Sequence, residues 1–65
     1  MFIKTREMFK SKETGAEIRV TKITRSKAGN KFDDCLIKNY VNGKPIHTSL
    51  RMVYADSIRR RYWKV

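Results

Sequence analysis

The dipeptide Asn42-Gly43 constrains the fold of this chain more than any other feature of its sequence. A type I′ turn needs a positive φ at both central residues, and Asn-Gly is the pair that best supplies it. The runs on either side can then pair as a β-hairpin in which Val41 faces Lys44. Pro45 follows in a non-hydrogen-bonded pair, where its missing N–H costs the ladder nothing. The sequence therefore predicts a tight hairpin centred on residues 41–44.

This register divides the hairpin into an apolar face and a polar face. We expect Ile37 to face Thr48 and Cys35 to face Leu50. A shift of one residue would mix the two faces, so the turn and the hydrophobic pattern agree on one register. The apolar face is predicted to carry Cys35, Ile37, Val41, Ile46 and Leu50, and the polar face to carry Leu36, Lys38, Tyr40, His47, Ser49 and Arg51.

The segments before the hairpin are expected to add two strands. In residues 16–25, Ile18 and Val20 alternate with polar residues, as in a half-buried strand. Ile23 falls out of phase by one position, and a bulge near 21–22 would return it to the core and bend the strand. Residues 1–9 are expected to be extended and to pair with this strand through a turn containing Gly15.

The C-terminal segment admits two interpretations. Tyr54, Ile58 and Tyr62 are spaced by four residues, as on one face of a helix. Residues 60–65 alternate as in a strand. We expect one helical turn over 54–58 and then a short strand over 60–65, with a continuous helix from about Ala55 as the alternative.

The size of the chain favours one small domain over residues 1–65. A 65-residue chain buries little surface. Its single cysteine, Cys35, excludes an internal disulfide, and no Cys/His cluster suggests a structural zinc. No cofactor is expected. We read Cys35 as a small buried hydrophobe of a cytoplasmic protein. Apolar runs are far shorter than the roughly 20 residues that cross a bilayer, so no membrane association is expected.

Together these elements predict a mostly β fold: a small five-stranded SH3-like barrel with a short helical turn before the last strand, or alternatively a β-sheet plus a C-terminal helix. The stretches TGAEIRVTKI, the NG hairpin and TSL…YWKV resemble small, uncharacterised SH3-like-barrel proteins of bacteriophages and prophages. That resemblance implies a phage or mobile-element origin, hence the host cytoplasm, and a binding role. It implies no catalytic residue.

The charge of the chain points to a polyanionic partner. Sixteen basic residues oppose six acidic ones, for a net charge of +10, which favours nucleic acid. Five basic residues and no acidic one lie in 19–31, and five basic residues lie in 51–65 against one acidic residue. The hairpin core, 32–50, is neutral. We expect the two basic stretches to form one continuous surface flanking the hairpin.

The run Arg59-Arg60-Arg61-Tyr62-Trp63-Lys64 combines the groups that a nucleic-acid surface needs. Guanidinium groups bind phosphate oxygens in pairs, and aromatic rings stack on unpaired bases. We nevertheless expect Trp63 to be a core residue. The predicted contact residues are Lys22, Arg25, Lys27, Lys31, Lys38, Tyr40, Arg51, Arg59, Arg60, Arg61, Tyr62 and Lys64.

Catalytic patterns are weak. His47 and Ser49 share a predicted face, but a hydrolase triad also needs a carboxylate behind the histidine, and we favour an exposed histidine in an edge hairpin. Asp33 and Asp34 are adjacent in a strand and point to opposite faces, which does not suit a metal-dependent nuclease. We therefore expect no enzyme activity.

The favoured function is that of a small basic regulatory protein of a phage or mobile element, which contacts the phosphate backbone of DNA or RNA as a monomer or homodimer. One alternative is a phage-encoded interaction module that inhibits an acidic host protein. Another is a small nuclease built on His47.

Overall fold

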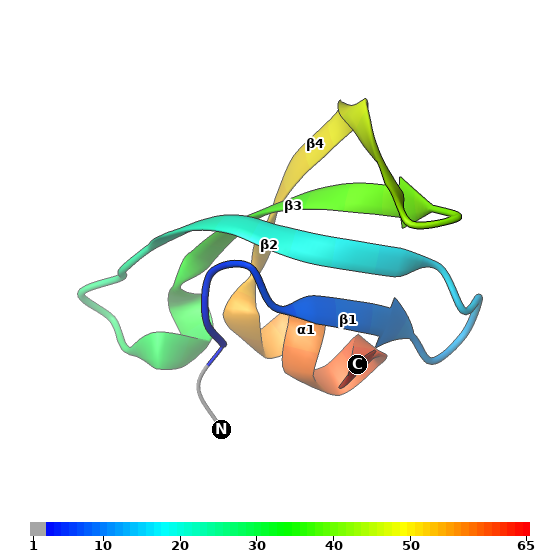
Figure 1. Cartoon of the computed structure of the whole chain (residues 1–65). Helices are drawn as coiled ribbons and strands as arrows, with labels where there is room; N and C mark the ends of the chain where they lie inside the picture. The colour runs from blue at the N-terminus through cyan, green and yellow to red at the C-terminus, as the bar shows by residue number, and fades with distance from the viewer. Residues whose placement is uncertain (1–2) are drawn as a thin grey trace.

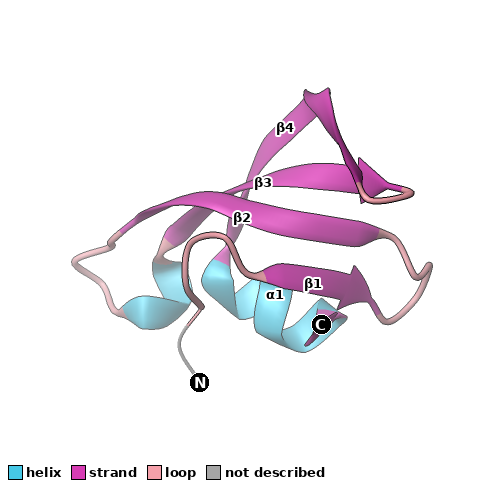
Figure 2. Cartoon of the chain, in the orientation of Figure 1, coloured by secondary structure: helices cyan, strands magenta, loops and turns pink. Residues whose placement is uncertain are grey.

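The computed structural model describes residues 3–65, and its strands form one antiparallel sheet in the order β4-β3-β2-β1-β5. Met1 and Phe2, part of the predicted first extended segment, lie outside the described residues. The sheet curls over a short helix, as Figures 1 and 2 show. The elements are β1 (Met8–Ser11), β2 (Glu17–Thr24), the 3-10 helix η1 (Asn30–Phe32), β3 (Asp34–Val41), β4 (Lys44–Tyr54), α1 (Ala55–Arg61) and β5 (Tyr62–Lys64).

The prediction of a mostly β fold with a short helix before the last strand is confirmed. Helix α1 is longer than the single turn expected over 54–58, and it ends at Arg61 instead of continuing to the C-terminus. Among residues 3–65, strand pairing does not join β4 to β5. The sheet is therefore curled but open, and the predicted closed barrel is not formed by the hydrogen-bonded strands.

The tight turn after β3 is confirmed. Asn42 and Gly43 have φ values of 53° and 78°, the two positive angles that a type I′ turn requires. Val41 pairs with Lys44 and Tyr40 pairs with Pro45, as the sequence predicts. The start of the hairpin is thus set by local backbone chemistry alone.

Beyond this start, the predicted register is wrong. Ile37 pairs with Arg51 instead of Thr48, and Cys35 pairs with Val53 instead of Leu50, because β4 carries extra residues between its two paired segments. At this irregularity the Ser49 hydroxyl accepts the Asn39 N–H at 2.8 Å, a donor that the regular ladder would have satisfied. Figure 1 shows that β4 is sharply bent along its length.

The shifted register changes which side chains are buried. Cys35 and Ile37 are buried as predicted, whereas Val41, Ile46 and Leu50 are exposed. Strand β4 leads directly into α1. Val53 at the end of β4 packs against the core, and Ala55 at the start of α1 is buried in it, in place of the three exposed residues. A seven-residue helix has little stability alone, so α1 depends on this packing against the core to remain folded.

Strand β2 contains the predicted bulge. Its pairing with β3 shifts between Val20 and Lys22, and the Thr21 hydroxyl donates to the Leu36 carbonyl at 2.9 Å. Ile23 packs against the core from a half-buried position, as the sequence pattern requires. The bulge bends β2, so the sheet can enclose one small core.

The core lies between the curled sheet and α1. Its buried side chains come from the residues before β1, from β1 to β3, and from α1. Ile58 is fully buried and is the main contribution of α1. In residues 3–65, no helix is both long enough and apolar enough to span a bilayer. The buried apolar set is Ile3, Phe9, Ile18, Val20, Cys35, Ile37, Ala55 and Ile58.

Replacing Ile58 with alanine is expected to destabilise the protein by about 2–5 kcal/mol, because the cavity would lie at the contact between helix and sheet. A domain of this size has a total stability of only about 3–10 kcal/mol. Urea unfolding followed by circular dichroism measures the loss. Ile46→Ala, on the exposed part of β4, is the control and should change stability by less than about 1 kcal/mol. Equal effects of the two variants would contradict this account of the core.

Candidate nucleic-acid interface

The outer face of the sheet carries a row of side chains from four strands. Trp63 on β5 pairs with Lys10 on β1, Lys10 pairs with Glu17 on β2, and Glu17 pairs with Tyr40 on β3. Directly paired residues point to the same side of a sheet. Since Phe9 and Ile18 point into the core, this alternating set points outward.

A second row lies beside the first and centres on Arg19. Arg19 pairs with Met8 on one side and Lys38 on the other. Its guanidinium carbon lies 4.8 Å from the centre of the Tyr40 ring, and it donates to the Tyr40 hydroxyl at 3.1 Å and to the Met8 sulfur at 3.2 Å. These contacts hold the Arg19 guanidinium over the aromatic ring as a cation–π pair.

The outer face is strongly basic. Lys22, which pairs with Leu36, extends this basic surface along β2. The Lys38 ammonium lies 3.1 Å from Nδ1 of His47, which can accept a hydrogen bond from it only when that nitrogen is unprotonated. Glu17 is the acidic member of the first row. We name Lys10, Arg19, Lys22, Lys38, Tyr40 and Trp63 the outer-face cluster.

Trp63 is exposed, and its predicted place in the core is wrong. Its side of β5 is the outer side, and 60% of its surface is accessible. Tyr62, on the opposite side of the strand, is half-buried and packs against the core. The alternation of β5 therefore buries one of the two adjacent aromatic rings and presents the other to solvent.

The basic loop after β2 is fixed by a buried carboxylate. Asp33 accepts the Ser26 N–H at 2.7 Å and pairs with the Arg25 guanidinium at 3.0 Å. Its carbonyl accepts the Ala55 N–H at 2.9 Å, which ties the loop to α1. The Ser26 hydrogen bond, then Arg25 and more weakly Arg59, lower the pKa of Asp33 despite its burial. Arg25 and Arg59 thus both act on one carboxylate.

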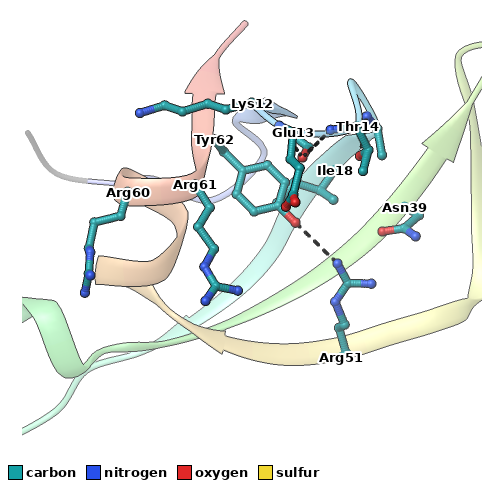
Figure 3. A pocket seen from close by; sticks show the side chains of 11 residues that line it. Lys12, Glu13, Thr14, Ile18, Asn39, Arg51, Arg60, Arg61 and Tyr62 are labelled. Carbon is teal, nitrogen blue, oxygen red and sulfur yellow. Dashed lines mark hydrogen bonds between the residues drawn. The ribbon is translucent and has the colours of Figure 1, made fainter.

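A hollow of about 610 Å³ opens on the inner side of the sheet, near the gap between β4 and β5. Figure 3 shows Arg51, from β4, and Tyr62, from β5, joined by a 3.4 Å hydrogen bond in which the guanidinium donates to the hydroxyl. The lining residues are Ser11, Lys12, Glu13, Thr14, Ala16, Ile18, Asn39, Arg51, Arg60, Arg61 and Tyr62.

The predicted contact residues separate into groups instead of forming one flat surface. Lys22, Lys38 and Tyr40 lie on the outer face. Arg25, Lys27 and Lys31 lie on or beside the loop 25–33, with Arg59 close to Asp33. Arg51, Arg60, Arg61 and Tyr62 line the hollow, and Lys64 pairs with Glu7 at 2.6 Å.

The two basic stretches therefore approach one another only in part. Arg59 and Arg25 influence the same carboxylate, whereas Arg60 and Arg61 are among the residues that line the hollow. Arg60 also contacts Asp56 at 3.4 Å, as an i,i+4 pair on α1. Consecutive residues of a helix point in different directions, so three adjacent arginines cannot share one contact.

Sequence reasoning missed Lys10, Lys12 and Arg19, and it misplaced Trp63. Arg19 alternates with the buried Ile18 and Val20, so its position on the outer face could have been found from the pattern. Lys10 follows Phe9, one position out of the core. The contact of Arg19 with Tyr40 depends on cross-strand register and leaves no local signal.

Ser49, the candidate partner of His47, is engaged in a structural contact, because its hydroxyl donates to the Ile46 carbonyl. Cys35, expected to be a small buried hydrophobe, is fully buried, and this burial raises the pKa of its thiol. Within residues 3–65, no group of three or more His, Cys, Asp or Glu side chains could hold a metal ion.

No protein-family model matches this chain, and neither curated proteins nor solved structures include a significant match.

Acidification should remove the stabilising effect of Asp33. Because the folded state lowers its pKa below the ordinary value of 3.8, the ionised carboxylate stabilises the fold above that pH and loses its effect as the pH falls through the folded pKa. Asp33→Asn should lower the melting temperature at pH 7, and the difference from wild type should shrink below about pH 4. Thermal unfolding from pH 7 to pH 2 checks this. A difference independent of pH would contradict it.

Proposed function

We propose that this protein is a small, open SH3-like barrel that binds single-stranded nucleic acid, DNA or RNA, on the outer face of its sheet. The strand order and the helix before the last strand support the SH3-like assignment. The cations of the outer-face cluster would contact phosphates, and Trp63 would stack on a base. No reaction is required of the site.

The carrying observation is the cross-strand row that places the exposed Trp63 beside Lys10 on a face otherwise dominated by cations. The exposed ring of Trp63 gives this face a flat aromatic surface on which an unpaired base can stack. Base stacking with flanking positive charge is the recognition mode of single-strand binding surfaces. The Arg19 guanidinium, 4.8 Å from the centre of the Tyr40 ring, offers a second planar group for stacking.

The shape of the molecule favours a single strand over a duplex read through its major groove. Among residues 3–65 the longest helix is α1, which has seven residues, and it directs Ile58 into the core. Reading base edges in the major groove usually requires an inserted helix or ribbon with exposed polar side chains. A curled sheet with an exposed aromatic residue suits splayed bases better.

Binding should weaken with salt in proportion to the number of phosphates engaged. If the four cations of the outer-face cluster each contact one phosphate, affinity for a single strand should fall about 50-fold between 50 and 200 mM NaCl. Fluorescence anisotropy with labelled 15-nucleotide DNA and RNA, and with duplex controls, measures the slope. Lys10→Gln with Lys38→Gln should reduce the slope of log K against log salt by about 1.4.

Lys44→Gln is the matched control, because Lys44 pairs with Val41 and lies on the opposite side of the hairpin from Tyr40. Lys44→Gln removes one charge without changing the outer-face cluster. It should therefore reduce the slope of log K against log salt by less than the loss of a lysine of the cluster does. Binding that does not depend on salt, or equal effects at all three lysines, would refute a phosphate interface on this face.

Trp63→Ala tests the stacking part of the proposal separately. Loss of one stacked base should weaken single-strand binding by about 5- to 150-fold and leave the salt slope unchanged. Because Trp63 is 60% exposed, the fold should persist, and Trp63→Phe should recover part of the affinity. Unchanged affinity of Trp63→Ala would exclude stacking at this residue.

A further inference from the structure

The hollow between the edge strands differs from the outer face because its charges converge. Arg51 lines it from β4 and Arg61 from the end of α1, whereas Lys12, from the turn after β1, lines it with its ammonium group directed away. The Lys12 N–H donates to the Arg61 carbonyl at 2.9 Å, so this turn and the end of the helix are joined. Figure 3 shows the Arg51 guanidinium at the Tyr62 hydroxyl and the Arg61 side chain beside the Tyr62 ring.

The charge balance of the hollow favours an anion. In the described chain, Arg51, Arg61 and Lys12 form no ion pair, and Glu13 is the one carboxylate in the lining. Arg60 is drawn toward Asp56 and contributes less. Guanidinium groups that are not neutralised by carboxylates are the preferred partners of phosphate oxygens in proteins.

The hydroxyl groups of the lining also favour a ligand that accepts hydrogen bonds. Ser11 Oγ accepts the N–H groups of Glu13 and Thr14, both at 3.2 Å, and Thr14 Oγ1 accepts that of Ala16. The Tyr62 hydroxyl accepts from Arg51. In residues 3–65, none of these hydroxyl groups donates in turn, so each retains its hydrogen for a ligand oxygen.

Within residues 3–65, the side-chain oxygen of Asn39 is a buried acceptor without a donor. The Asn39 side chain lines the hollow, and its Oδ1 is the one buried side-chain oxygen or nitrogen without a hydrogen-bond partner in the part of the chain that the structure describes. Such an acceptor is costly until it is paired. The apolar surfaces of Ile18, Ala16 and the Tyr62 ring complete the lining. The ligand should therefore combine an anionic group with donors and a flat or apolar part.

We propose that the hollow is a binding site for a nucleotide with a terminal phosphate, either a free mononucleotide or the phosphorylated end of a strand. A terminal phosphate carries about 1.5 to 2 negative charges at pH 7, more than the single charge of an internal diester, and so gains more from converging cations. Arg51 and Arg61 hold the phosphate, and the Tyr62 hydroxyl donates to it. The strand-end form builds on the proposed function, whereas the mononucleotide form does not depend on it.

The probes are adenosine 5′-monophosphate, adenosine and inorganic phosphate, titrated into ¹⁵N-labelled full chain and followed by NMR. The monophosphate should shift the amides of Asn39, Arg51, Arg61 and Tyr62, and adenosine should bind at least about tenfold more weakly. Absence of these shifts would overturn the proposal. If inorganic phosphate bound as tightly as the monophosphate, the nucleotide assignment would be wrong.

Two oligonucleotides of the same sequence, one with a 5′-phosphate and one with a 5′-hydroxyl, distinguish the sources. A preference of about tenfold for the phosphorylated strand supports recognition of a strand end. Equal binding of the two strands together with monophosphate binding assigns the site to the free nucleotide. Trp63→Ala should weaken the oligonucleotides and leave the monophosphate unaffected, so failure of the outer-face function and failure of this site are separable.

Arg51→Gln and Arg61→Gln should each weaken the monophosphate about tenfold or more, and Lys44→Gln, which removes the same charge away from the hollow, should not. Tyr62→Phe keeps the ring that packs on the core and removes only the hydroxyl, so it tests the donor role without disturbing the fold. Equal weakening by all of these charge variants would show a general electrostatic effect and overturn a built site.

Discussion

Burial of Ile58 beneath a curled sheet is the contact on which the rest of the structure depends. A chain of 65 residues without a disulfide has one small core, and here one short helix fills the concave side of one sheet. Helix α1 would be unstable alone, and a flat sheet would leave Phe9, Ile18 and Ile37 in water. Each element supplies the surface that the other has to bury.

The curvature that this packing needs comes from two interruptions of the strand ladder. In β2 the pairing shifts between Val20 and Lys22, and in β4 it shifts opposite Lys38. Hydroxyl groups satisfy the backbone groups that lose their ladder partners at these shifts. The Thr21 hydroxyl donates to a carbonyl, and the Ser49 hydroxyl accepts from an N–H. Bulged strands bend and twist more strongly than regular ones, so these polar side chains help to shape the sheet.

An open, curled sheet has two chemically different sides. Its outer side combines alternate residues of every strand into one surface, on which Arg19, Tyr40 and Trp63 come from different strands. Its inner side is sealed by α1 over the core and stays hollow near the unpaired edges, where Arg51 meets Tyr62. The proposed strand surface and the proposed nucleotide site follow from these two sides of one sheet.

Local chemistry, read from the sequence by itself, determined the turn at Asn42-Gly43, the bulge in β2, the burial of Cys35 and the mostly β class, because each depends on residues near one another in the chain. The basic character was equally evident. Tertiary structure alone decided the register of β4, the exposure of Trp63 and the separation of Arg59 from Arg60 and Arg61. Regular pairing and shifted pairing satisfy the local pattern about equally well, and what separates them is which side chains α1 can cover.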